Sequence, residues 1–141
     1  MDKDLALAKR LLTTEEHTCV LCRDVRIYTS TRRGVAPLLD WLDSGLDLRG
    51  FSAADRVIGK ATAYLYCLLG VNEVFARVIS RPATQVLENH GIPALWDTLV
   101  EGIQNRQKTG PCPMEHATRD CTTAQEALAA VRQTLDALRK G

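Results

Sequence analysis

Hydrophobic and polar positions alternate in two different ways over the first thirty residues. Residues 3–14 carry apolar side chains every three or four positions, which predicts a helix with one apolar face. Residues 18–23 are instead rich in strand formers, Asp24 interrupts them, and residues 25–29 alternate apolar and polar side chains. This second pattern predicts a β-hairpin.

The middle of the chain contains two helix-like segments. Apolar residues from Val35 to Leu46 repeat at helical spacing, and Gly45 or Gly50 is expected to end that helix. Residues 56–69 are apolar almost all round, which predicts a helix buried on every side and ended by Gly70.

The second half alternates between strand-like and helix-like segments. Residues 74–80 read as a strand, and Pro82 suits the first turn of a helix that ends near residues 89–91. Residues 94–100 give a weaker strand pattern, and a final helix is expected over residues 123–139. The predicted order is α-β-β-α-α-β-α-β-α, which favours an α/β fold with a mixed sheet covered on both faces.

Length and composition are those of one ordinary globular domain, which we expect to span residues 1–141. The 18 basic and 17 acidic side chains nearly cancel, so the charge does not support nucleic acid or a membrane surface as a partner. No segment has the roughly 18 apolar residues of a membrane span, and residues 1–4 do not open a secretion signal. We therefore expect a cytoplasmic protein, and its five cysteines to be reduced thiols.

The order of elements resembles the cytidine deaminase fold over residues 3–100. The resemblance includes a buried helix that begins near residues 59–63 and a strand that ends at Ser80. It implies a three-layer α/β/α domain with a mixed sheet. Within that superfamily the chain is most similar to a small prokaryotic family of uncharacterised proteins, through the segments 20–30, 33–35, 57–61, 78–80 and 112–115.

The zinc motifs of deaminases are missing from this sequence. Zinc deaminases carry a His or Cys with a Glu at the start of the buried helix, and a Pro-Cys-x-x-Cys motif at the start of the next. The corresponding positions here are Gly59-Lys60-Ala61-Thr62 and Arg81-Pro82-Ala83-Thr84-Gln85. Without these ligands there is no metal-activated water. We expect no bound metal, no cofactor and no deaminase reaction.

Lys60 and Cys112 are the candidate catalytic residues. Lys60 follows Gly59 at a helix start, where a cation opposes the helix dipole, so it either contacts a ligand or simply reaches solvent. Cys112 lies between two prolines before a short expected helix, and Glu115 or His116 would act as its base if the thiol were a nucleophile. Lys60 would then polarise a bound carbonyl. Cys112 is otherwise a ligand-lining residue or a structural one in a fixed turn.

Two further segments are candidates for ligand binding. The loop from Ser30 to Gly34, which includes Arg33, offers hydroxyl, guanidinium and backbone N–H groups to an anion, or else caps the helix after it. Ser80 presents the same alternatives of helix cap and pocket wall. Glu115 and Gly59 complete the set of expected ligand-binding residues.

These residues support two hypotheses about function. In the first, the domain binds a small anionic or carbonyl-bearing ligand in the former deaminase pocket, with or without catalysis. In the second, the pocket is vestigial and the domain is a dimerisation or protein-interaction module. The resemblance implies a homodimer in either case, with a helix carrying Trp41 or Trp96 as a contact. An open polar pocket joining Lys60 to Cys112 would favour the first hypothesis, and a site filled by Leu65 or Met114 the second.

Overall fold

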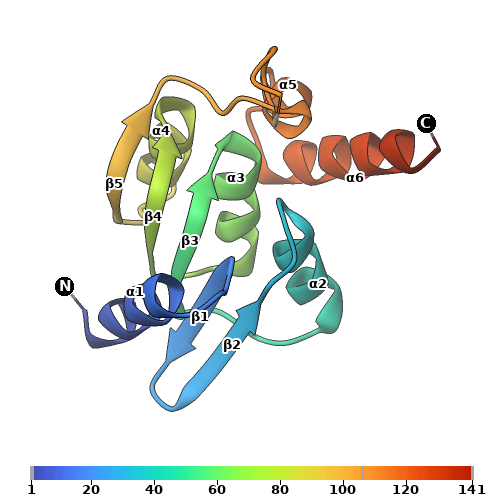
Figure 1. The fold of residues 1–141 in the computed structure, drawn as a ribbon. Helices are drawn as coiled ribbons and strands as arrows, with labels where there is room; N and C mark the ends of the chain where they lie inside the picture. The colour runs from blue at the N-terminus through green and yellow to red at the C-terminus, as the bar shows by residue number, and fades with distance from the viewer. Residues whose placement is uncertain (1, 106, 141) are drawn as a thin grey trace.

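The computed structural model describes residues 2–105 and 107–140, which form a five-stranded sheet with helices on both of its faces (Figure 1). The elements along the chain are α1 (Lys3–Thr14), β1 (Cys19–Arg23), β2 (Arg26–Ser30), α2 (Ala36–Ser44), β3 (Ser52–Ile58), α3 (Lys60–Leu69), β4 (Glu73–Ser80), α4 (Arg81–Asn89), β5 (Ala94–Val100), α5 (Pro113–Thr118) and α6 (Ala124–Lys140). The sheet order is β2-β1-β3-β4-β5. The mixed α/β class is therefore as predicted.

Strand directions divide the sheet into an antiparallel part and a parallel part. β1 is antiparallel to both of its neighbours, β2 and β3, whereas β3, β4 and β5 run parallel to one another. The hairpin of β1 and β2 turns at Asp24, whose φ of 55° lies in the left-handed region that Asp tolerates better than most residues. The predicted hairpin is confirmed.

Alternate side chains of β1 pack into two separate hydrophobic cores. Val20 and Cys22 pack with the apolar face of α1, as do Ala54 and Phe75. Cys19 and Leu21 belong to the larger core, which also contains residues of α2, α3, α4 and α6. Because successive side chains of a strand point to opposite faces, α1 covers one face of the sheet and the other helices pack on the opposite face. Figure 1 shows α1 crossing the sheet on its own side.

The sequence-based prediction missed β3. Residues 56–69 read as one buried helix, but Arg56 to Ile58 end a strand, Gly59 is the N-cap, and α3 begins only at Lys60. β3 is the central strand and its first four residues are buried, so it shows no alternation of apolar and polar positions. It also begins Ser-Ala-Ala-Asp, which has little strand propensity.

The remaining predicted elements are present. α3 ends at Gly70, whose φ is 75°, and the Gly70 N–H bonds back to the Tyr66 and Cys67 carbonyl groups. The Pro82 helix is α4, the weak strand is β5, and a short α5 follows Cys112. Within residues 2–105 and 107–140, none of the helices combines the length and apolarity required to span a bilayer.

Candidate functional site

A cleft of about 620 Å³ opens where β3 ends and α3 begins. Its walls come from four separate parts of the chain: the loop before α2, the β3–α3 junction, residues 103–105 together with 107 and 112–115, and the second half of α6. Five of the residues that we predicted for ligand binding or catalysis line it, namely Arg33, Gly34, Gly59, Cys112 and Glu115. The parallel strands of α/β sheets commonly place ligands at this carboxyl end.

Glu115 reaches from α5 onto the first turn of α3. One of its carboxylate oxygens, Oε1, accepts a hydrogen bond from the Lys60 backbone N–H. A Cβ atom added to Gly59 would lie 2.1 Å from that oxygen, so the carboxylate occupies the space that a larger residue would need. Burial raises the pKa of Glu115, while the Lys60 N–H bond and the Lys60 charge oppose the rise. The Glu115 carboxylate thus accepts a hydrogen bond from one of the N–H groups that have no partner within α3.

Lys60 begins α3 as predicted, but its side chain turns away from the large cleft. Its Nζ donates to the Arg119 backbone carbonyl at 2.7 Å. The side chain lines a second cleft of about 290 Å³, and Glu115 and Ile103 line both clefts. Lys60 and Cys112 therefore belong to adjoining clefts with Glu115 between them.

Cys112 is the N-cap of α5 and is half-buried in the wall of the large cleft. Its backbone N–H donates to the Ile103 carbonyl at 2.8 Å, and its carbonyl accepts the His116 N–H at 3.0 Å. The His116 side chain is exposed, and within the described chain no hydrogen bond joins it to the Cys112 thiol. The backbone is thus well fixed, but the thiol has no hydrogen-bonded base.

The two predicted serines do not line the large cleft. The Ser30 hydroxyl accepts a bond from the Arg32 N–H at 3.1 Å, and the Arg32 side chain pairs with Asp40. Ser80 is fully buried, and its hydroxyl accepts the Ala83 N–H at 3.3 Å as the cap of α4. Both hydroxyl groups accept hydrogen bonds from nearby backbone N–H groups, and Ser80 is therefore the helix cap that we gave as its alternative role.

Thr62 is a cleft residue that sequence analysis did not select. It is 8% exposed, lines the cleft, and its hydroxyl makes no hydrogen bond to another described residue. Apolar side chains of α6, Leu135 and Leu138, also line the cleft. Leu65 lies in the core and Met114 lines the cleft without filling it. The cleft is open, and its described walls are mostly apolar.

No group of three or more His, Cys, Asp or Glu side chains in the described parts of the chain is placed to hold a metal ion. Cys112, His116 and Cys121, which lie close together in the sequence, do not form such a group.

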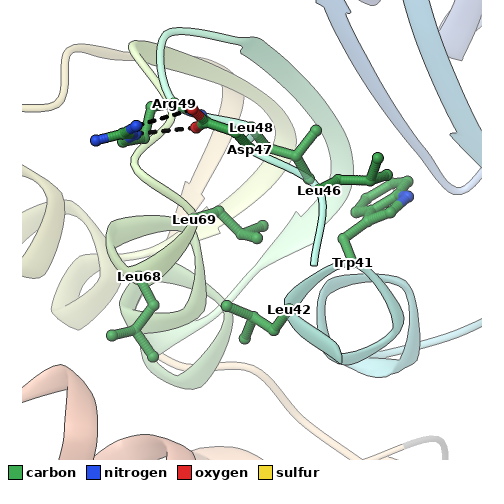
Figure 2. Close-up of a pocket in the computed structure, with 8 residues that line it drawn as sticks. All are labelled: Trp41, Leu42, Leu46, Asp47, Leu48, Arg49, Leu68 and Leu69. Atoms are coloured by element: carbon green, nitrogen blue, oxygen red, sulfur yellow. Dashed lines mark hydrogen bonds and ion pairs between the residues drawn. The ribbon is translucent and has the colours of Figure 1, made fainter. Parts of the chain in front are cut away.

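A smaller cavity of about 210 Å³ lies far along α3, near its end (Figure 2). Leu42, Leu68 and Leu69 line it, and so do Asp47 and Arg49, an exposed ion pair 2.8 Å apart. The Arg49 guanidinium lowers the pKa of Asp47. Trp41 also lines this cavity and is only 9% exposed, so it does not form the exposed helical contact that we expected for a dimer. None of the predicted site residues lies here.

Comparisons with known proteins identify the family. The TM1506 family, described as a domain of unknown function (DUF1893), matches residues 7–135. The chain is similar to the crystal structure of a DUF1893 family protein (TM1506) from Thermotoga maritima, with a TM-score of 0.86, 20% identity, and coverage of 94% of this chain and 91% of that one. No curated protein matches. The shared fold and the match over most of its length place this chain in the DUF1893 family.

Proposed function

We propose that this protein binds a small molecule with a carboxylate or another carbonyl group in the 620 Å³ cleft. The observation that carries the proposal is the unpaired polar set at the start of α3. Ala61 and Thr62 are its second and third residues, so their backbone N–H groups have no partner within the helix. The first helical bond is made by Ala63 to Gly59, at 2.9 Å.

Thr62 adds a side-chain donor to these two N–H groups. Its side chain lines the cleft wall, and its hydroxyl makes no hydrogen bond to another described residue, so it can donate to a ligand in the cleft. An oxygen acceptor on a ligand would satisfy the hydroxyl and an N–H group together. Arg33, exposed at the mouth of the cleft, adds a positive charge that suits a carboxylate.

The rest of the ligand should be apolar. Val35, Val57, Leu135 and Leu138 line the cleft, and Val57 and Leu138 are 42% and 56% exposed. A ligand with an apolar body would cover these side chains while its polar head contacts α3. Most of its affinity would come from this burial, and its orientation from the polar end.

We also infer that the domain shares the cytidine deaminase fold. The hairpin after α1, followed by alternating strands and helices, supports this inference. The fold analogy places the ligand at the start of the buried helix, where the cleft lies, but carries no chemistry with it. On this inference, Gly59, Lys60 and Thr62 would lie where a zinc deaminase needs a metal ligand and a catalytic carboxylate.

A thermal-shift screen tests the binding proposal. Small carboxylic acids with apolar bodies should raise the melting temperature, whereas their alcohols of equal size should not. Thr62→Val keeps the shape of the side chain but removes its hydroxyl, and we expect it to weaken binding by about tenfold, as for one lost hydrogen bond to a charged group. Arg33→Gln should weaken acids more than neutral carbonyl compounds.

Arg32→Gln is the matched control, because Arg32 neighbours Arg33 but pairs with Asp40 and does not line the cleft. A screen in which acids and alcohols shift the melting temperature equally, or in which Thr62→Val changes no response, would refute the proposed contact.

The interaction-module hypothesis also has an observation in its favour. β5 leaves Leu95, Trp96 and Leu99 exposed by 36–46% along one edge of the sheet. This apolar edge is separate from the cleft, so binding and assembly do not exclude each other.

A further inference from the structure

β5 is an edge strand without the usual protection against pairing. It is seven residues long, and no strand of the described chain pairs with its outer edge. Edge strands usually avoid assembly through Lys, Pro, a bulge or short length. β5 has the sequence ALWDTLV, in which Asp97 is the only charged residue. The opposite edge, β2, is shorter and begins with Arg26.

The outward-pointing backbone groups of β5 can be identified from its pairing with β4. The Val74 N–H bonds to the Pro93 carbonyl at 3.0 Å, so the backbone of residue 93 faces β4. Main-chain groups alternate along a strand, so those of Leu95, Asp97 and Leu99 also face β4. The N–H and C=O groups of Trp96, Thr98 and Val100 therefore point outward.

We propose that β5 pairs antiparallel with β5 of a second copy of this chain, joining the two sheets across a two-fold axis. A strand edge is complementary to itself under such an axis, because each outward N–H meets an outward carbonyl. The exposed Leu95, Trp96 and Leu99 side chains would be partly covered at the same time. The partner is a second copy because the row of donors, acceptors and apolar side chains matches itself.

Charge and side-chain pairing select the register. A pair centred on Asp97 places two carboxylates opposite each other, and one centred on Leu99 places Asp97 opposite Glu101. A pair centred on Thr98 avoids both arrangements. It places Thr98 opposite its own copy and Trp96 opposite Val100 twice, and both kinds of pair are favourable across antiparallel strands.

The experiment measures oligomeric state by light scattering and sedimentation for the full chain and three variants. The wild type should be a dimer of twice 15.6 kDa at micromolar concentration. Trp96→Lys replaces both Trp96–Val100 contacts with a cation beside an apolar side chain and should raise the dimer dissociation constant about 30-fold or more, as for the loss of one interface hot spot. Thr98→Pro removes an outward N–H and should have a similar effect, since Pro is tolerated where an edge N–H faces solvent.

Ile27→Lys is the matched control, because Ile27 is 45% exposed on the other edge strand, β2. It should remain a dimer. Hydrogen exchange gives an independent readout: the amides of Trp96 and Thr98 should gain protection as the wild-type concentration rises. A monomeric wild type, or a dimer that both Trp96→Lys and a folded Thr98→Pro leave intact, would overturn the proposal. If Thr98→Pro does not fold, Trp96→Lys and the exchange data decide.

Discussion

Asp55 is a carboxylic acid enclosed by the core, close to two other ionisable groups. The Tyr66 hydroxyl donates to its Oδ2 at 2.6 Å, and the Cys19 thiol lies 2.9 Å from the same hydroxyl. Burial raises the pKa of Asp55 to about 6, although the bond from Tyr66 and the nearby backbone N–H groups lower it in part. Because the Tyr66 hydroxyl and nearby backbone N–H groups bond to its carboxyl oxygens, Asp55 can be buried in the central strand β3.

The pH dependence of stability should report this group. Because the folded-state pKa lies above the usual value of 3.8, the stabilising contribution of Asp55 is complete at low pH and is lost as the pH rises through about 6. We expect the free energy of unfolding to fall by about 2–3 kcal/mol between pH 4 and pH 7 from Asp55 alone. Asp55→Asn should flatten that slope in urea titrations. An unchanged slope would show that Asp55 does not titrate in this range.

Cys112 should be the first of the five cysteines to react with an alkylating agent. Burial raises the pKa of Cys22 and of Cys67 to about 11, and it also raises the pKa of Cys19 and Cys121. A thiol with a raised pKa forms little thiolate near neutral pH, and thiolate is the reactive form.

Iodoacetamide labelling with residue mapping by mass spectrometry measures the order of reaction. Cys112→Ser should remove the fastest phase and leave the others unchanged. Earlier labelling of Cys121, which is also partly exposed, would contradict the expected order.

At the scale of elements, the contact between α5 and the start of α3 depends on one glycine. Gly59→Ala would drive its Cβ into the Glu115 carboxylate, which must move and lose its bond to the Lys60 N–H. We expect a loss of about 1 kcal/mol in the free energy of unfolding, since the end of a flexible side chain can yield.

Gly102→Ala is the control, because a Cβ there meets nothing within 4 Å. Glu115→Ala should cost a similar amount, and the two changes together should cost less than their sum. Full additivity in urea denaturation would mean that Gly59 and Glu115 do not interact.

The same scale shows what the sequence predicts and what it leaves out. α1 and the hairpin follow from local periodicity, because each has one covered face and one exposed face. β3 does not, because a strand buried on both faces loses its alternation. The Glu115 contact joins residues 55 positions apart, so no local pattern contains it. Lys60 was expected beside Cys112, but its chain length lets it reach the Arg119 carbonyl instead.

At the scale of the whole molecule, the sheet and the cleft are built from different parts of the chain. All five strands lie within residues 19–100, whereas the cleft also needs α5, α6 and the segment that precedes them. Along the sequence, the last strand of the sheet therefore precedes α5 and α6, the elements that complete the walls of the cleft. The β5 edge and the cleft share no lining residue, so the proposed pairing of β5 would leave the cleft lining uncovered.

The Glu115 contact also bears on the order of folding. During synthesis, residues 19–100 emerge before α5, so the sheet forms while the start of α3 still has an unpaired Lys60 N–H group. With residues 60–100 already folded, docking of α5 has to close only the segment between the end of β5 and Glu115, and it adds a contact that the sheet does not need. We infer that this docking is a late event on the folding pathway. The reverse motion, release of α5 from α3, would then be among the first openings of the native state, with the sheet intact.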